Sequence, residues 1–242
     1  MQEQFLRSQM ILGQEAMERL RQSHVAVFGL GGVGSYAVEA LVRSGVGELT
    51  LIDSDTVSVT NLNRQIEALH SSLGQNKCDA VAARCLDINP QVILHPVCGL
   101  YSAETRERFW SNYDYVIDAI DLVSCKLDLI ETAQHRRIPI ISALGTGNKL
   151  DPSLLTVTDI SKTYGCPLAR VMRRELRARG ILHSKVIFSP EQPPKTQQLE
   201  SPPPGRRSVP ASNPWVPATA GLLLGSAVVR DLIKEERGES SC

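Results

Sequence analysis

The glycine-rich run GLGGVG at residues 29–34 constrains the fold of this chain more than any other feature. It follows an apolar segment typical of a β-strand, residues 24–28, and opens a segment with helical spacing, residues 34–44. The glycines, Gly29, Gly31, Gly32 and Gly34, let a backbone approach a phosphate, while the helix that follows offers free N–H groups and a partial positive charge. The strand, turn and helix together predict a nucleotide-binding site.

A second apolar strand, residues 48–52, ends at Asp53. This aspartate lies about 20 residues beyond the glycine turn, where a carboxylate can accept hydrogen bonds from ribose hydroxyls. The arrangement up to this point suits NAD as well as ATP.

Strand and helix patterns alternate along the chain as far as residue 142. A helix at residues 10–21 precedes the first strand, and later helices are expected at residues 77–89, 103–110 and 126–136, with strands at 91–96, 113–117 and 138–142. Alternation of this kind predicts a Rossmann-like α/β fold with a mostly parallel, twisted sheet flanked by helices.

The remaining chain predicts a C-terminal extension of the same domain. Strands are expected at residues 154–159 and 185–189, on either side of a basic helix at 169–179. Prolines dominate residues 190–217, which predicts a long and flexible loop, and a helix follows at 218–234. We therefore expect one domain over residues 1–242, with a core at 20–152 and an extension at 153–242.

Composition excludes several other classes of protein. Hydrophobic residues make up 42% and charged residues 21%, with a formal net charge of zero, so a protein that coats nucleic acid is disfavoured although a local basic patch remains possible. The N-terminus lacks the basic and then apolar segments of a secretory signal peptide. The apolar run near the C-terminus is too short to span a bilayer, so we expect a cytoplasmic protein. Six cysteines without a C-x-x-C pair disfavour a zinc knuckle and a redox motif.

Polar and cationic residues downstream of Asp53 favour triphosphate chemistry. Asn61, Arg64 and Lys77 are surplus to dinucleotide binding, and two cations near a phosphate-binding turn can hold phosphate oxygens. The alternative is that Arg64 and Lys77 only solvate a surface. Asp121 follows a strand at the edge where ligands bind and could hold magnesium, whereas Asp118 is equally well explained as a turn or capping residue.

These residues resemble the superfamily of ThiF, MoeB and the ubiquitin-activating enzymes, from residue 7 to about residue 152. The shared motifs are GLGGVG at 29–34, LIDSD at 51–55, NLNRQ at 61–65, Lys77 and DAID at 118–121. Within it, the chain is most similar to the TcdA branch, the tRNA threonylcarbamoyladenosine dehydratases, through NRQI at 63–66, DINP at 87–90, Asp-Pro at 151–152 and CPLA at 166–169.

The resemblance implies a role for each site residue. Asp53 holds the ribose and Asp55 belongs to the same nucleotide site. Asn61, Arg64 and Lys77 hold the phosphates. Asp121 holds the magnesium, and Arg7 reaches into the site of a partner subunit, which implies a homodimer. The expected cofactors are ATP and Mg²⁺, and the residues expected to carry the chemistry are Arg7, Arg64, Lys77 and Asp121.

The implied reaction is adenylation of a carboxylate by positioning and cationic stabilisation. In the TcdA branch the substrate is the threonyl carboxylate of threonylcarbamoyladenosine in tRNA, which then closes a ring with loss of water and needs no protein nucleophile. A basic segment could contact tRNA phosphates, although such runs are usually solvated helix faces: Arg170, Arg173, Arg174, Arg177, Arg179 and Lys185, with Arg206 and Arg207 as weaker additions.

The chain departs from activating enzymes that transfer thioesters. Residues 190–217 contain no cysteine, and Cys166, the one cysteine near a substrate edge, is better explained by packing or a helix start. Three alternatives stay open: adenylation of a ubiquitin-like sulfur carrier, with that carrier or a cysteine desulfurase as partner; an NAD-dependent oxidoreductase; and a non-catalytic module that only binds nucleotide.

Overall fold

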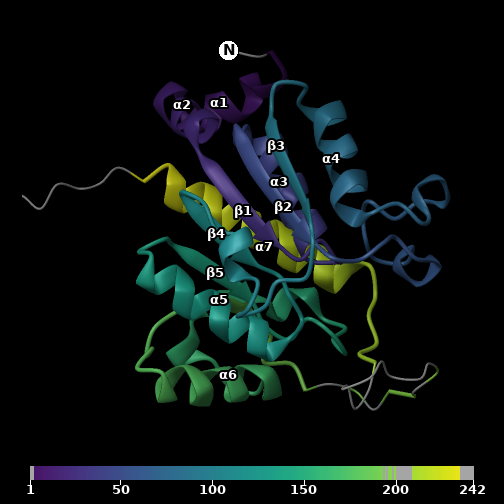
Figure 1. Ribbon diagram of the computed structural model, residues 1–242, viewed down its shortest axis with the longest axis vertical. Helices are drawn as coiled ribbons and strands as arrows, with labels where there is room; N and C mark the ends of the chain where they lie inside the picture. The colour runs from purple at the N-terminus through teal and green to yellow at the C-terminus, as the bar shows by residue number, and fades with distance from the viewer. Residues whose placement is uncertain (1–2, 193, 195, 198, 200–208, 235–242) are drawn as a thin grey trace, which may run out of the picture.

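Seven strands form one sheet in the order β3-β2-β1-β4-β5-β7-β6 (Figure 1). Their bounds are β1 His24–Phe28, β2 Glu48–Asp53, β3 Ile93–Cys98, β4 Tyr115–Asp118, β5 Ile140–Ala143, β6 Thr156–Asp159 and β7 Lys185–Phe188. Neighbouring strands are parallel except for β6, which is antiparallel to β7. The computed structural model describes residues 3–192, 194, 196–197, 199 and 209–234. The predicted mostly parallel α/β sheet is confirmed.

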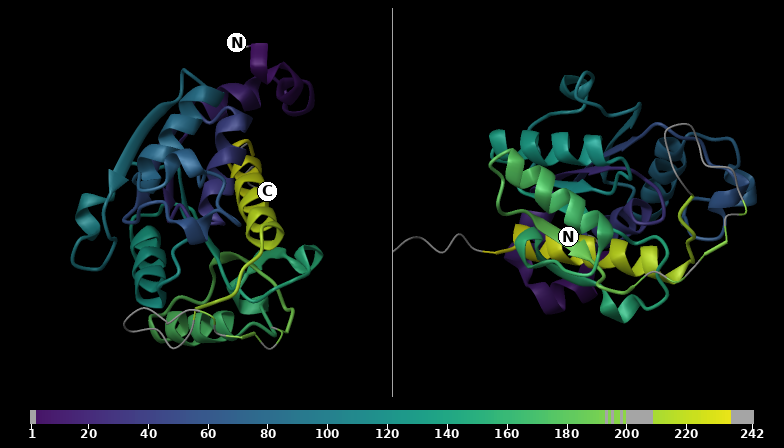
Figure 2. Two further views of the ribbon diagram at one scale, coloured as in Figure 1. Left: turned by 90° about the vertical axis from the view of Figure 1, so that its right-hand side faces the viewer. Right: turned by 90° about the horizontal axis from the view of Figure 1, so that it is seen from below.

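Helices cover both faces of the sheet. Their bounds are α1 Leu6–Leu12, α2 Gln14–Gln22, α3 Gly34–Ser44, α4 Lys77–Ile88, α5 Val123–His135, α6 Pro167–Ala178 and α7 Trp215–Leu232. One apolar cluster joins the strands to α2, α3, α4 and α7, and a second joins the opposite side of the strands to α5 and α6. Figure 2 shows α5 and α7 on opposite sides of the strands. The extension after residue 152 supplies β6, β7 and α7, so it completes the same sheet and core.

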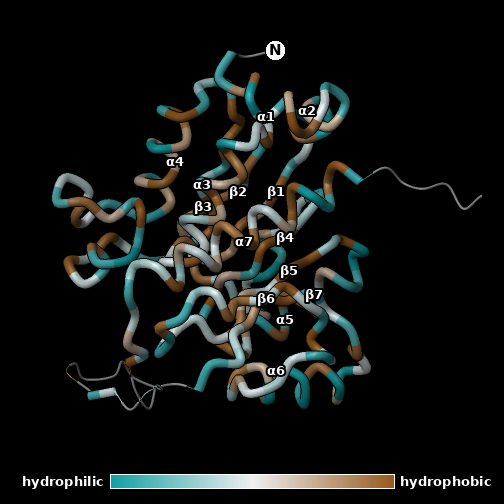
Figure 3. The backbone as a smooth tube through the Cα atoms, turned by 180° about the vertical axis from the view of Figure 1, so that it is seen from behind, coloured by the Kyte–Doolittle hydropathy of each residue, from teal (hydrophilic) through white to brown (hydrophobic). Residues whose placement is uncertain are grey.

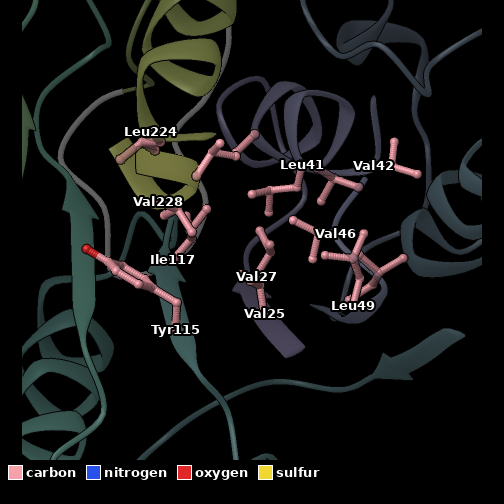
Figure 4. Close-up of a cluster of buried hydrophobic side chains, with 14 of the residues drawn as sticks. Val25, Val27, Leu41, Val42, Val46, Leu49, Tyr115, Ile117, Leu224 and Val228 are labelled. Atoms are coloured by element: carbon pink, nitrogen blue, oxygen red, sulfur yellow. The ribbon is translucent and has the colours of Figure 1, made fainter. Parts of the chain in front are cut away.

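The C-terminal helix α7 packs closely on α3, more than 170 positions earlier in the chain. A Cβ atom on Gly221 would collide with the carbonyl oxygen of Val33, and one on Gly225 would lie 2.5 Å from Cβ of Ala40. Leu224 and Val228 of α7 point into the apolar cluster beneath the sheet (Figure 4). Glycine therefore allows the backbones of the two helices to approach. Over the described ranges, no helix has the length and apolar character needed to cross a membrane.

Two helix predictions were wrong in detail. The segment predicted at 10–21 is broken at Gly13, whose φ of 87° ends α1 before α2 begins, and Met10 and Ile11 are 83% and 85% exposed instead of buried. The helix predicted at 103–110 is only a 3-10 turn, Arg106–Arg108, because this segment folds around aromatic side chains. Tyr101 and Phe109 pack edge to face there, 5.8 Å apart between ring centroids.

The proline-rich segment has the irregular structure that its sequence predicts. Its described residues form no helix or strand between the end of β7 and Trp215. Residues 193, 195, 198 and 200–208, Arg206 and Arg207 included, lie outside the described ranges, and the flexibility of the loop stays a prediction. The helix predicted from 218 already begins at Trp215. Pro217 lies in the first turn of α7, where proline is tolerated. The side chain of Asn213 accepts a hydrogen bond from the N–H of Val216 at the start of the helix.

The basic helix α6 is amphipathic. Ala169, Met172 and Leu176 are buried at helical spacing, while Arg170 and Arg177 are exposed. Figure 3 shows hydrophilic and hydrophobic positions alternating along this helix. Burial of one face fixes α6 on the sheet and leaves its arginines directed away from the core.

Candidate functional site

A cavity of about 460 Å³ opens at the carboxyl ends of β1, β2 and β4, where the strand order reverses. Open α/β sheets bind ligands at this switch point. Nine of the candidate site residues line it, and so lie together in the structure: Gly29, Gly31, Gly32, Asp53, Asp55, Asn61, Arg64, Lys77 and Asp121.

The glycine turn lets three backbone segments meet. Gly29 has a φ of 91°, and a Cβ atom there would lie 2.7 Å from the carbonyl oxygen of Ala119 after β4. A Cβ atom on Gly34 would collide with the carbonyl oxygen of Gly29, so Gly34 starts α3 against the turn and does not line the cavity itself. Gly31 and Gly32 present bare backbone to the cavity.

Asp53 holds the turn in addition to lining the cavity. One carboxylate oxygen accepts a hydrogen bond from the N–H of Leu30 at 2.7 Å, and the other accepts from the N–H of Asp55 at 2.8 Å. Hydrogen bonds to a charged acceptor are strong, so the end of β2 and the glycine turn are fixed to each other.

The two cations on the cavity wall are held differently. Lys77 is 5% exposed at the start of α4, and its Nζ atom lies 2.9 Å from Asp55, so it does not solvate a surface. Arg64 is partly buried, and its guanidinium donates to the carbonyl of Thr60 and the side chain of Asn63, each at 2.8 Å. Lys77 is therefore preorganised by burial, and Arg64 is preorganised by the hydrogen bonds that it donates to the preceding turn.

Asn61 is a buried residue of the cavity wall. Its side-chain oxygen accepts a hydrogen bond from the N–H of Ser58 at 3.0 Å, which stabilises the 3-10 turn Val59–Asn61. This turn directs the following residues, Arg64 included, toward the cavity.

The two aspartates after β4 have separate roles. Asp118 is fully buried and lies 2.9 Å from Nζ of the equally buried Lys126, and its other oxygen accepts from the N–H of Ile120. It does not line the cavity, which matches its interpretation as a turn residue. Asp121 is exposed on the cavity wall, where its carboxylate can meet a ligand.

Sequence reasoning missed one wall of the cavity. The missed residues include Thr146, Gly147, Val209, Pro210, Ser212 and Pro217. The backbones of Asn148 and Ala211 are joined by a hydrogen bond of 2.8 Å, and Asn63 donates to the carbonyl of Ser212 at 3.1 Å. These contacts join positions 63 to 149 residues apart, so no local pattern could have revealed them.

Glu67 is a second residue that sequence reasoning missed. Its side chain is 3% exposed, and neither carboxylate oxygen has a hydrogen-bond partner among the described residues. Burial raises the pKa of Glu67 to about 7, although the nearby Lys77 and Ser35 act in the opposite direction. The cavity thus has a buried carboxyl group behind its buried lysine.

Comparison with known proteins agrees with this geometry. The model of the ThiF family matches residues 4–235 of the chain. The chain belongs to the ThiF family. The tRNA threonylcarbamoyladenosine dehydratase of Bacillus subtilis (strain 168) is 44% identical over 242 residues, which cover 96% of this chain and 95% of that protein. The molybdopterin-synthase adenylyltransferase of Salmonella typhimurium (strain LT2) is 32% identical over 152 residues, covering 63% of this chain and 61% of that protein.

A solved structure extends the similarity to the fold. The crystal structure of the E. coli dehydratase TcdA in complex with ATP has a TM-score of 0.86 and 34% sequence identity, and the match covers 96% of this chain and 94% of that one. The similarity therefore includes the whole extension after residue 152, where the sequence motifs marked only residues 166–169.

Arg7 lies away from the cavity of this chain. It is exposed on α1, two residues from Phe5, which packs near Gly45 after the last turn of α3. The first turn of α3 faces the glycine run, and the helix has 11 residues, which separates its two ends by about 16 Å. In Figure 1, α1 and α2 lie beside the start of β1, at the opposite end from α6.

Most cations of the basic segment have partners within the ThiF-family domain. Arg173 donates to the carbonyl of Thr163, Arg174 lies 2.7 Å from Glu175, Arg179 lies 3.7 Å from Glu131, and Lys185 lies 2.5 Å from Asp231. Arg170 and Arg177 have no such partner among the described residues.

Cys166 is buried at the start of α6 rather than exposed to a ligand. Its Sγ atom accepts a hydrogen bond from the N–H of Ala169, so it caps the helix, as the helix-start interpretation expects. A Cβ atom on Gly145 would lie 2.6 Å from this sulfur, which places the start of α6 next to the cavity wall formed by Thr146 and Gly147.

The buried carboxyl group predicts a pH-dependent stability. The folded-state pKa of Glu67 is about 7, above its ordinary value of 4.5. Between these two pH values the folded protein keeps a proton that the unfolded chain has lost. The free energy of unfolding therefore falls as the pH rises through this window. Glu67→Gln should raise the free energy of unfolding at pH 8, by on the order of 3 kcal/mol at most, and change it little at pH 4.5. Urea unfolding at both pH values measures this difference.

Glu15→Gln is the control, since the Glu15 side chain is 86% exposed. It should shift stability equally little at both pH values. A Glu67→Gln variant whose stability difference from the parent protein is the same at pH 4.5 and pH 8 would contradict the assignment.

Proposed function

We propose that this chain uses ATP and Mg²⁺ to adenylate the threonyl carboxylate of threonylcarbamoyladenosine in tRNA and so to dehydrate it to a cyclic product. The observation that carries the proposal is the set of phosphate-binding groups around one cavity, in a chain similar to the Bacillus subtilis dehydratase over nearly the full length of both. ATP in the E. coli TcdA structure supports the choice of nucleotide.

The cavity fits a nucleoside triphosphate. Its volume of about 460 Å³ is within the usual range of small-molecule sites. Bare backbone at Gly31 and Gly32, beside the N-terminus of α3, suits phosphate oxygens. Asp53 lies at the end of β2, where a ribose is bound in related folds.

Bound ATP would supply an α-phosphate for attack by the substrate carboxylate, with pyrophosphate as the leaving group. In this proposal Arg64 and Lys77 stabilise the charge that builds up on the phosphates, and they are positioned before the substrate arrives. Asp121 supplies a hard oxygen ligand for Mg²⁺ at the cavity wall. The activated carbonyl is then attacked from within the same modified nucleoside, which closes the ring and releases AMP, so no side chain has to form a covalent bond.

The first experiment is ATP–pyrophosphate exchange with tRNA that carries threonylcarbamoyladenosine and with the same tRNA lacking it. Exchange and loss of one water from the nucleoside are expected only with the modified tRNA. Arg64→Ala and Lys77→Met should each lower the rate about 100-fold or more, because each removes a cation from the phosphate site. Methionine is chosen at position 77 because the lysine is buried and alanine would leave a void.

Arg21→Ala is the matched control, since Arg21 is an exposed arginine on α2, outside the cavity, and should leave the rate unchanged. Exchange with a ubiquitin-like sulfur carrier but with neither tRNA would instead favour the adenylyltransferase alternative. Tight NAD binding without ATP binding would favour an oxidoreductase. ATP binding without pyrophosphate release would favour a non-catalytic module.

We also propose that the enzyme is a homodimer in which Arg7 completes the partner's site. Three large apolar side chains on α1 are exposed beside it: Leu6 at 46%, Met10 at 83% and Ile11 at 85%. An apolar surface of this kind on a short helix is typical of a protein–protein contact. Covering it with a second copy would also bring Arg7 against another subunit.

Mixing two inactive variants tests this arrangement. Dimers of either single variant, Arg7→Ala or Lys77→Met, should be nearly inactive. Co-expression of the two variants should recover about a quarter of normal activity. The reason is that about half of the dimers are then mixed, and each mixed dimer has one complete site out of two. Pyrophosphate exchange of the mixture, with mixed dimers verified by two affinity tags, is the measurement. Mixed dimers that form but remain inactive would rule out action of Arg7 in the partner's site.

For tRNA we propose phosphate contacts through Arg170 and Arg177. They are exposed seven residues apart, which places both on one side of α6, and the start of this helix adjoins the cavity wall. Cations without acidic partners are free to neutralise phosphates and release counterions.

The double change Arg170→Gln with Arg177→Gln should weaken tRNA binding. It should also make the negative slope of log K against log salt shallower by roughly two, one for each lost phosphate contact. Arg174→Gln is the control on the same helix, because Arg174 already pairs with Glu175. Fluorescence anisotropy at several salt concentrations gives the slopes. An unchanged slope in the double variant would place the tRNA elsewhere.

A further inference from the structure

Two histidines and a glutamate converge from three adjacent strands at the amino ends of β1 and β2, the end of the sheet opposite the cavity. His24 begins β1 and pairs in register with Glu48 at the start of β2. His95 of β3 pairs with Thr50, two positions after Glu48 and therefore on the same face. One possible ligand atom from each of His24, Glu48 and His95 lies within 4.8 Å of the other two.

The distances between these atoms suit a small metal ion. Nδ1 of His24 lies 3.4 Å from Oε1 of Glu48, and Nε2 of His95 lies 2.7 Å from the same oxygen. Ligands placed around tetrahedral zinc at about 2.0–2.2 Å lie roughly 3.4 Å from one another. Side-chain adjustments of about an ångström would therefore be enough to surround an ion, without a change in the strand register.

The surroundings orient the ligands. Nε2 of His24 lies 2.8 Å from Oγ1 of Thr50, which leaves Nδ1 toward Glu48. The ring of His24 also packs edge to face on Tyr113, with centroids 4.9 Å apart. Metal-binding histidines commonly have their second ring nitrogen held in this way.

The cluster is open to solvent on one side. The side chain of His24 is 14% exposed, that of Glu48 32% and that of His95 47%. An ion could enter on the side of the exposed His95, and a water molecule could complete the coordination. Two imidazoles and one carboxylate form a donor set that favours zinc and similar transition metals over magnesium or calcium.

We propose that His24, Glu48 and His95 form a binding site for a divalent transition metal such as zinc, separate from the nucleotide cavity. Bound metal would link β1, β2 and β3 at the end where β1 follows α2. Its effect would be on stability, because the site lies at the far end of the strands from the cavity and shares no residue with it.

Isothermal titration of the chelator-treated full chain with zinc tests the site. One zinc ion per chain should bind, and zinc should raise the melting temperature, since a ligand that binds only the folded state stabilises it. Cobalt substituted into the same site should show the visible bands of a four-coordinate ion. His95→Gln and Glu48→Gln should each weaken zinc binding at least tenfold and remove the rise in melting temperature.

His183→Gln is the matched control, because His183 forms an exposed pair with Asp159 at 3.3 Å and has no third ligand in the described part of the chain. Zinc binding should persist in this variant. His95 is half-exposed and outside the cavity, so His95→Gln should keep the far-ultraviolet circular dichroism and the pyrophosphate exchange of the parent protein. Absence of zinc binding in the parent chain would overturn the proposal. Equal zinc affinity in the parent and in both ligand variants would overturn it too, because the metal would then be bound elsewhere.

Discussion

The close approach of the glycine turn to the end of β4 is the constraint on which the rest of the site depends. Gly29 lies against Ala119 so closely that a side chain would not fit, and Gly34 lies still closer to Gly29. Asp53 then ties the turn to β2 through the N–H of Leu30. Three strand ends are thus held at one point, and α3 begins there with its N-terminus directed at the cavity. Loss of this contact would displace all of these groups together.

The elements that could be predicted from sequence are those with local causes. The glycine run, the apolar strand before it and Asp53 after the next strand follow from short-range patterns, and all of them have the expected positions. Motif order also identified Lys77, Arg64 and Asp121 as members of one site. Strands of this fold converge at their carboxyl ends, so residues that follow successive strands come together without any long-range information.

The remaining features depend on contacts between distant parts of the chain. Hydrophobic spacing predicted one helix over residues 10–21, but the conformation of Gly13 breaks it and leaves Met10 exposed. The burial of Glu67 follows from packing around the cavity, and a glutamate in sequence gives no sign of it. Pro210 and Ser212 reach the cavity through backbone pairing with the segment around Asn148, which is about 60 residues away. Tertiary contacts decide each of these cases.

In the proposed dimer, the charge of the cavity would connect nucleotide binding to assembly. Among the described residues, its wall has three carboxylates, Asp53, Asp55 and Asp121, and two cations, Arg64 and Lys77, and Lys77 is already paired with Asp55. A triphosphate would enter a site with a surplus of negative side chains, which is unfavourable where water is partly excluded. The N-terminus of α3 offsets only part of this charge. A metal ion and an arginine from a second subunit would supply the rest, so binding of ATP and formation of the dimer should strengthen each other.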